Sequence, residues 1–207
     1  MSTSTTRERL IEATAGLFQR QGYAGTGVKQ ITEAASAPFG SMYHFFPDGK
    51  EELGAATLRW SGAVYGQLID LFYPAGADPV DATRQFFDGA ADVVRDSGYV
   101  DACPIATVAL EVSSTSEVMR LACAEVFESW LVAIDANLVA AGLTRRQAHD
   151  ASVALFSLLE GAFILARATR DEGHVRTAGR TAAAVVAAAL AQRSAQIAAR
   201  RTPTSTP

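Results

Sequence analysis

The sequence predicts an all-α protein with two parts: an N-terminal three-helix unit containing a helix-turn-helix, and a larger C-terminal helical domain. Apolar residues recur at intervals of three and four along most of the 207 residues, which is the spacing of amphipathic helices. Glycines and prolines interrupt this pattern, so we expect about nine separate helices. The length suits one or two small domains with a buried core.

The most distinctive pattern lies in residues 26–53. It predicts a short helix over about Gly27–Ala35, with Thr26 as its N-cap. A second short helix is expected to begin at Ser36 or Ala37, after which a third helix starts. Helices this short are unstable alone, so each must pack against neighbouring elements.

The second short helix has features that suit contact with a nucleic-acid backbone. Gly40 near its start lowers the stability of an exposed helix, which makes sense if a large partner approaches the backbone there. Phe39 and Ser41 are expected to point outward, and Tyr43 and His44 carry donors suited to fixing the unit on DNA. This helix contains no Arg or Lys, so it cannot read guanine through a bidentate arginine.

Phosphate contacts are also expected from outside this helix, including one from the first turn of the third helix. The residues predicted to contact DNA are Arg7, Thr26, Gly27, Lys29, Pro38, Phe39, Gly40, Ser41, Tyr43, His44 and Lys50. Met42, Phe45 and Phe46 are expected to face inward. The alternative interpretation is an ordinary helical hairpin in a globular core.

Residues 36–45, SAPFGSMYHF, resemble the recognition segment of TetR-family transcriptional regulators. The stretches APFGSMYHFFPDGKEEL and CPIATVALE are similar to the LmrA/YxaF-like subgroup, so the resemblance spans most of the chain. We therefore expect a DNA-binding domain over residues 1–47 and a ligand-binding and dimerisation domain over residues 48–200. Residues 201–207 are expected to form a disordered tail.

The composition limits the other functions of the chain. With 18 Lys and Arg against 22 Asp and Glu, the formal charge is -4, which argues against a general nucleic-acid coat but not against a specific reader. Two cysteines, Cys103 and Cys123, favour a reducing cytoplasm over a disulfide scaffold, with a thiol sensor as the alternative. We expect no signal peptide and no membrane partner, because the longest apolar run, residues 182–191, is too short to span a bilayer.

Nothing in the sequence predicts catalysis. His44, His149 and His174 fall on separate elements, and neither His149 nor His174 has a second ligand at a suitable offset. There is no phosphate-binding loop or dinucleotide glycine signature, so we expect no metal, no cofactor and no enzyme activity.

The C-terminal domain is instead expected to hold a small lipophilic or aromatic effector. Its candidate lining residues are aromatic, with a few polar groups: Tyr65, Phe72, Phe87, Thr107, Glu111, Phe127, Trp130, Phe156, Glu160 and Phe163. Glu111 and Glu160 are the sharpest candidates, since a buried carboxylate needs a partner that a ligand could supply. The alternative is that these residues are plain core.

The last two helices, expected over about Thr144–Arg170 and Val175–Arg200, have broad apolar faces. The family resemblance implies that they form a four-helix interface in a homodimer; an internal hairpin is the alternative. The predicted interface residues are Leu155, Leu158, Leu159, Ala162, Ala183, Val186, Ala187 and Leu190.

These expectations combine into one predicted function. We expect a dimeric DNA-binding transcriptional regulator, most readily a repressor, that an effector releases from a near-palindromic operator. A DNA-binding dimer without an effector and a small helical enzyme are the alternatives.

Overall fold

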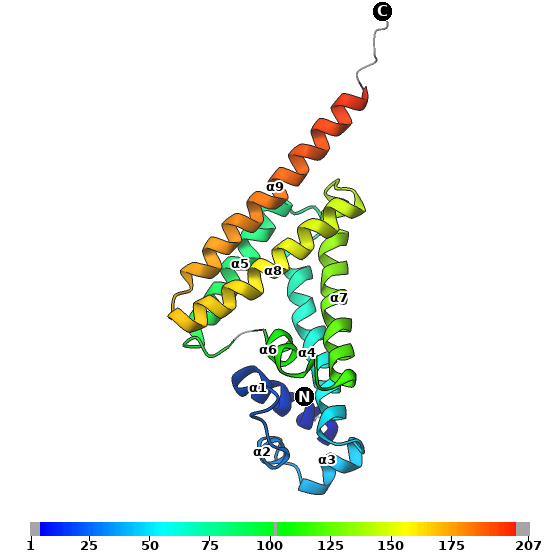
Figure 1. The fold of residues 1–207 in the computed structure, drawn as a ribbon, viewed down its shortest axis with the longest axis vertical. Helices are drawn as coiled ribbons and strands as arrows, with labels where there is room; N and C mark the ends of the chain where they lie inside the picture. Colours follow the sequence, from blue (N-terminus) through cyan, green and yellow to red (C-terminus); the bar gives the residue numbers. More distant parts are fainter. Residues whose placement is uncertain (1–4, 102, 202–207) are drawn as a thin grey trace, which may run out of the picture. The chain divides into compact units, whose positions relative to one another are not determined.

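The computed structural model describes residues 5–101 and 103–201, and all regular structure in that part of the chain is helical (Figure 1). The helices are α1 (Thr6–Gln21), α2 (Val28–Ala34), α3 (Phe39–Phe45), α4 (Lys50–Phe72), α5 (Pro79–Asp96), α6 (Pro104–Val112), α7 (Glu117–Ala140), α8 (Arg145–Thr169) and α9 (Gly173–Arg201). The predicted all-α fold is confirmed. The expected disordered tail lies outside the described residues, except for Arg201, which ends α9.

The described residues divide into two compact units. The first combines the chain up to Gln67 with Asp96–Ser129, and the second combines Leu68–Arg95 with the residues from Trp130 onward. Helices α4 and α7 each contribute residues to both units.

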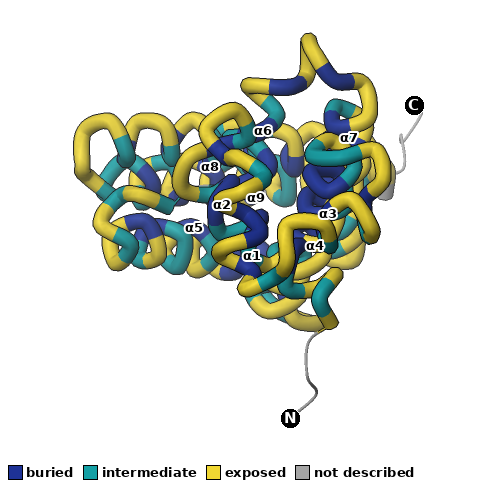
Figure 2. The backbone as a smooth tube through the Cα atoms, turned by 90° about the horizontal axis from the view of Figure 1, so that it is seen from below, coloured by how far each residue is buried: buried dark blue, intermediate teal, exposed yellow. Residues whose placement is uncertain are grey.

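The first unit contains the three-helix N-terminal part. Thr5 caps α1 in a reciprocal capping box with Glu8, and Gly22 ends α1 at a φ of 72°. The core beneath α1, α2 and α3 is apolar, and the buried parts of these helices are dark blue in Figure 2. Its buried members are Leu10, Ile11, Leu17, Ile31, Ala35, Met42, Phe46 and Leu53. Helices of seven residues are stable here because this core holds them.

Two boundaries in this region differ from the sequence prediction. The N-cap of α2 is Gly27, not Thr26, because the Thr26 hydroxyl is buried and donates to the Gly22 carbonyl at 2.7 Å. The second short helix begins at Phe39, later than expected. Ser36 has a φ of 49°, which breaks the helical path, and Pro38 is an extended N-cap.

In the second unit, α8 and α9 form a hairpin and lie side by side (Figure 1). Thr144 caps α8 in a capping box with Gln147. The close approach of α9 to α5 depends on Gly179 of α9, since a Cβ there would lie 2.5 Å from the Phe87 Cβ. Judged by length and composition alone, α8 and the Gly173–Arg200 part of α9 are long and apolar enough to cross a membrane, which for two helices is weak evidence, and the two helices pack on one another.

Candidate nucleic-acid interface

Helix α3 presents two large aromatic side chains to solvent. Phe39 is 54% exposed and Tyr43 is 48% exposed, and their ring centroids lie 5.9 Å apart on the same face of the helix. On the opposite side, Met42 is fully buried and Phe46, just after the helix, is almost fully buried, which confirms the predicted inward face. The packing of one side of α3 therefore fixes the direction in which the aromatic pair projects.

Two glycines beside the exposed face, Gly27 and Gly40, are not required by the protein's own packing. A Cβ at Gly27 or at Gly40 would meet nothing within 4 Å. Gly40 nevertheless lies in the first turn of α3, where glycine is less favourable than alanine by about 1 kcal/mol. A partner outside the chain that approaches the backbone closely would explain this choice.

Three of the predicted DNA-contacting side chains are engaged within the first unit or buried there. Thr26 is almost fully buried, so its side chain cannot reach DNA without local rearrangement. The Arg7 guanidinium lies 5.2 Å from the centroid of the Phe46 ring. The Lys50 ammonium donates to the Tyr23 carbonyl at 2.6 Å and lies 3.9 Å from the centroid of the Tyr23 ring. Burial lowers the pKa of Lys50, and the charge of Glu111 acts in the opposite direction.

The other predicted contacts are accessible. Lys29, Pro38 and His44 are exposed and Ser41 is half-buried. Lys29 makes only a loose helical pair with Glu33, at 3.8 Å, and its side chain is 83% exposed. The exposed candidates therefore gather on α3 and on the solvent side of α2.

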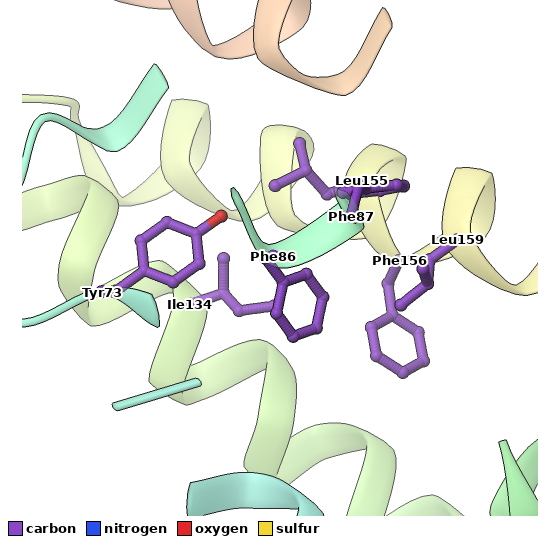
Figure 3. A pocket seen from close by; sticks show the side chains of 7 residues that line it. All are labelled: Tyr73, Phe86, Phe87, Ile134, Leu155, Phe156 and Leu159. Atoms are coloured by element: carbon purple, nitrogen blue, oxygen red, sulfur yellow. The ribbon is translucent and has the colours of Figure 1, made fainter. Parts of the chain in front are cut away.

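The second unit contains a small hollow that overlaps only in part with the predicted effector site (Figure 3). Its lining side chains come from α5, α7 and α8 and from the residue after α4: Tyr73, Phe86, Phe87, Ile134, Leu155, Phe156 and Leu159. Phe87 and Phe156 are the two predicted lining residues among them. The enclosed space is about 10 Å³, room for roughly one water molecule.

The remaining effector candidates do not line this hollow. Phe72 and Trp130 contact two of its lining rings, Phe86 and Phe156 respectively, each with ring centroids 5.6 Å apart. Glu160 and Phe163 are half-buried on α8. Tyr65, Thr107 and Phe127 belong to the first unit, as does Glu111.

The expectation of a buried carboxylate at Glu111 is wrong. Glu111 is exposed, and its Oε2 accepts a hydrogen bond from the Ala24 amide at 2.6 Å. Its carboxylate therefore already has a protein partner, and the reasoning that assigned it to an effector does not apply.

Most of the predicted dimer-interface residues are covered by their own chain. Leu155, Leu159, Ala162, Ala183 and Val186 are buried within the single chain. Their own chain therefore already covers most of their surface, and their place in an interface between two copies stays a prediction. Leu158 and Leu190 are half-buried and Ala187 is exposed.

One side of α3 is buried and the other faces solvent, and α3 belongs to a three-helix unit that precedes a helical domain. This arrangement defines a helix-turn-helix DNA-binding regulator. Comparison with known proteins agrees. Residues 10–57 match the model of the bacterial regulatory proteins of the tetR family, and residues 79–181 match the C-terminal domain of LmrA/YxaF-like transcriptional regulators. The chain belongs to the TetR family of transcriptional regulators and is not an enzyme.

Two curated relatives from Bacillus subtilis cover most of the chain. The HTH-type transcriptional regulator YxaF is 32% identical over 171 residues, which are 83% of this chain and 90% of YxaF. The HTH-type transcriptional regulator LmrA is 30% identical over 171 residues, covering 83% of this chain and 91% of LmrA. The predicted resemblance to the LmrA/YxaF-like subgroup is confirmed.

A solved structure shows the same fold at lower sequence identity. The regulatory protein TetR from Rhodobacter sphaeroides superposes with a TM-score of 0.78 and 23% identity, over 88% of this chain and 99% of that one.

Proposed function

We propose that this protein is a homodimeric repressor whose two α3 helices enter successive major grooves of a near-palindromic operator. The exposed Phe39–Tyr43 pair carries the proposal, because two large aromatic rings on a short helix otherwise expose apolar surface without compensation. Phe39 can contact thymine methyl groups, and the Tyr43 hydroxyl can bond to the backbone or to base edges. Such a protein acts where DNA is, in the cytoplasm.

A second copy of the chain is the proposed occupant of the outer face of α8 and α9. Val153, Ile164 and Leu165 are exposed on α8, the last two at 61% and 52%. The exposed residues of α9 between 184 and 191 are alanines, which allow close approach of another helix. Exposed apolar residues on α8 and exposed small residues on α9 support a four-helix contact between copies.

Effector control is the finer part of this proposal. The hollow is too small for an aromatic molecule in this conformation, so a ligand that binds there has to displace some of the lining side chains (Figure 3). A compound that binds the opened form better would shift the population away from the operator-bound form, by no more than its difference in affinity. A DNA-binding dimer without an effector is the second candidate.

The DNA claim can be tested with the DNA immediately upstream of the protein's own coding sequence. Tyr43→Ala should weaken binding about tenfold or more, as expected when a hydrogen bond to a charged phosphate is removed. Tyr43→Phe separates the hydroxyl from the ring, and Trp60→Ala, a partly exposed aromatic on α4, is the matched control. Unchanged affinity in folded Tyr43→Ala would refute the proposed interface.

The effector claim needs a separate measurement. A panel of flat aromatic compounds would be screened for a rise in melting temperature, and each hit tested for release of the operator. Hits that do both support effector control. No hit across the panel would favour the effector-free regulator.

A further inference from the structure

The turn between α1 and α2, residues 22–26, is held from two other helices of the same unit. Its Ala24 amide donates to the Glu111 carboxylate of α6 at 2.6 Å. Its Tyr23 carbonyl accepts from the Lys50 ammonium of α4 at 2.6 Å. A turn that needed only to reverse the chain would not require contacts from α6 and α4, so these contacts suggest a further role.

Glu111 is poorly placed for the stability of its own helix. It lies in the last turn of α6, where the negative end of the helix dipole disfavours a carboxylate. It is also the final residue of the CPIATVALE stretch, whose Cys103 and Pro104 start the same helix. A residue that destabilises its own helix is expected to make a favourable contact elsewhere. For Glu111 that contact is the hydrogen bond from the Ala24 amide.

The turn is shaped to receive this carboxylate. Gly22 has a φ of 72°, a conformation that side chains rarely adopt. A Cβ at Gly22 would also overlap the Glu111 carboxylate. Glycine at this position therefore serves both the backbone and the approach of Glu111.

The contact joins two parts of the chain that are distant in sequence. Ala24 lies within residues 10–57, matched by the tetR-family model, whereas Glu111 lies within residues 79–181, matched by the C-terminal model. Both belong to the first compact unit, in which α6 packs beside α1. Glu111 is thus a direct polar link between the turn that precedes α2 and helix α6.

We infer that Glu111 is a positioning residue that holds α1–α3 against α6 and so fixes the direction in which α3 meets DNA. This inference rests on the proposed binding of two heads to one operator, where "head" means α1–α3. A head released from α6 can tilt, and seating both heads on one duplex then costs the entropy of ordering them. One head on a single half-site does not need that alignment.

The test compares two duplexes and three variants. The first duplex is selected from a random library by the wild-type protein and contains two half-sites; the second has one half-site scrambled. Glu111→Ala removes the contact, and Glu111→Gln keeps a neutral acceptor. Glu128→Ala removes an exposed carboxylate from α7 as the matched control. Affinities are measured by fluorescence anisotropy, and amide hydrogen exchange is measured at Ala24.

Glu111→Ala should weaken binding to the two-site duplex about tenfold, or about 1.4 kcal/mol, and leave the single-site affinity within about twofold. Glu111→Gln should recover most of the affinity, and Glu128→Ala should match the wild type. Hydrogen exchange at the Ala24 amide should quicken in Glu111→Ala.

Two results would overturn the inference: unchanged two-site affinity in Glu111→Ala, or equal weakening on both duplexes together with a lower melting temperature. The second result would mean that Glu111 only stabilises the fold. If the wild type itself shows no preference for two sites, the proposed dimeric function fails instead. Hydrogen exchange then decides whether Glu111 holds the turn, since unchanged exchange at Ala24 in Glu111→Ala would refute that role.

Discussion

Lys50 and Lys29 are both predicted from the sequence to contact phosphate, but the structure places them differently, and this difference can be measured. The Lys50 ammonium is held by the Tyr23 carbonyl at 2.6 Å and by the Tyr23 ring at 3.9 Å. The Lys29 side chain is 83% exposed. We expect Lys50 to stabilise the turn between α1 and α2, and Lys29 to provide charge for DNA.

The magnitude follows from the two interactions of Lys50. A hydrogen bond to a charged group contributes about 1.5–3 kcal/mol, and a cation–π interaction at a partly exposed site about 0.5–1 kcal/mol. Solvent access to Lys50 reduces both, so Lys50→Met should destabilise the protein by about 2 kcal/mol. For a chain of this length that corresponds to a fall of roughly 4–8 °C in the melting temperature. Lys29→Met should leave the melting temperature nearly unchanged.

The salt dependence of operator binding separates the two roles. The logarithm of the affinity falls linearly with the logarithm of the salt concentration, and removing one phosphate contact reduces the steepness of this line by about 0.9. With two heads per dimer, Lys29→Met should make the line less steep by about 1.8. Lys50→Met should weaken binding without changing the steepness. If Lys50→Met made the salt dependence less steep and left the melting temperature unchanged, Lys50 would contact phosphate, and its proposed role in the turn would be refuted.

Two further predictions concern the C-terminal region and the thiols. Ile164→Asp on α8 should convert the dimer to a monomer in analytical ultracentrifugation. The control Leu110→Asp, at a site that is 80% exposed, should leave the dimer intact. A dimer that persists in Ile164→Asp would exclude the outer face of α8 as the interface. Burial raises the pKa of the Cys123 thiol from 9.0 to about 11, so iodoacetamide at neutral pH should label Cys103 in the native protein and spare Cys123, as read by mass spectrometry. The stabilisation from the buried neutral thiol is present below pH 9 and disappears as the pH rises through about 11, and equal labelling of both thiols at pH 7 would contradict this assignment.

The sequence predicts the helices well because each contains its own signals. Apolar spacing, the capping threonines Thr5 and Thr144 and the break at Gly22 are local, and the structure uses all of them. Thr26 misleads because a threonine before a helix is usually a cap, and only its packing shows that its hydroxyl turns back to Gly22. The start of α3 is misplaced because the φ of Ser36 depends on the surrounding fold rather than on its residue type.

The site residues beyond α3 are harder to predict because they depend on distant contacts. An apolar position such as Leu155 or Leu159 indicates burial, but not whether its own chain or a partner buries it. Glu111 lies 87 positions from Ala24, and no local pattern connects the two residues. A carboxylate among apolar residues suggests a ligand, whereas its partner is a backbone amide.

The charges around the head explain how a protein of net charge -4 can still read DNA specifically. Residues 5–50 contain five basic and four acidic side chains, so this region has little net charge to attract DNA of any sequence. Arg7 lies over Phe46, the Arg9 guanidinium donates to the Ala35 carbonyl at 3.2 Å, and Lys50 holds Tyr23. Three of the five basic groups therefore stabilise the region itself. We therefore expect operator binding to depend on the shape and apolar contacts of α3 more than on charge, and binding to non-specific DNA at physiological salt to be weak.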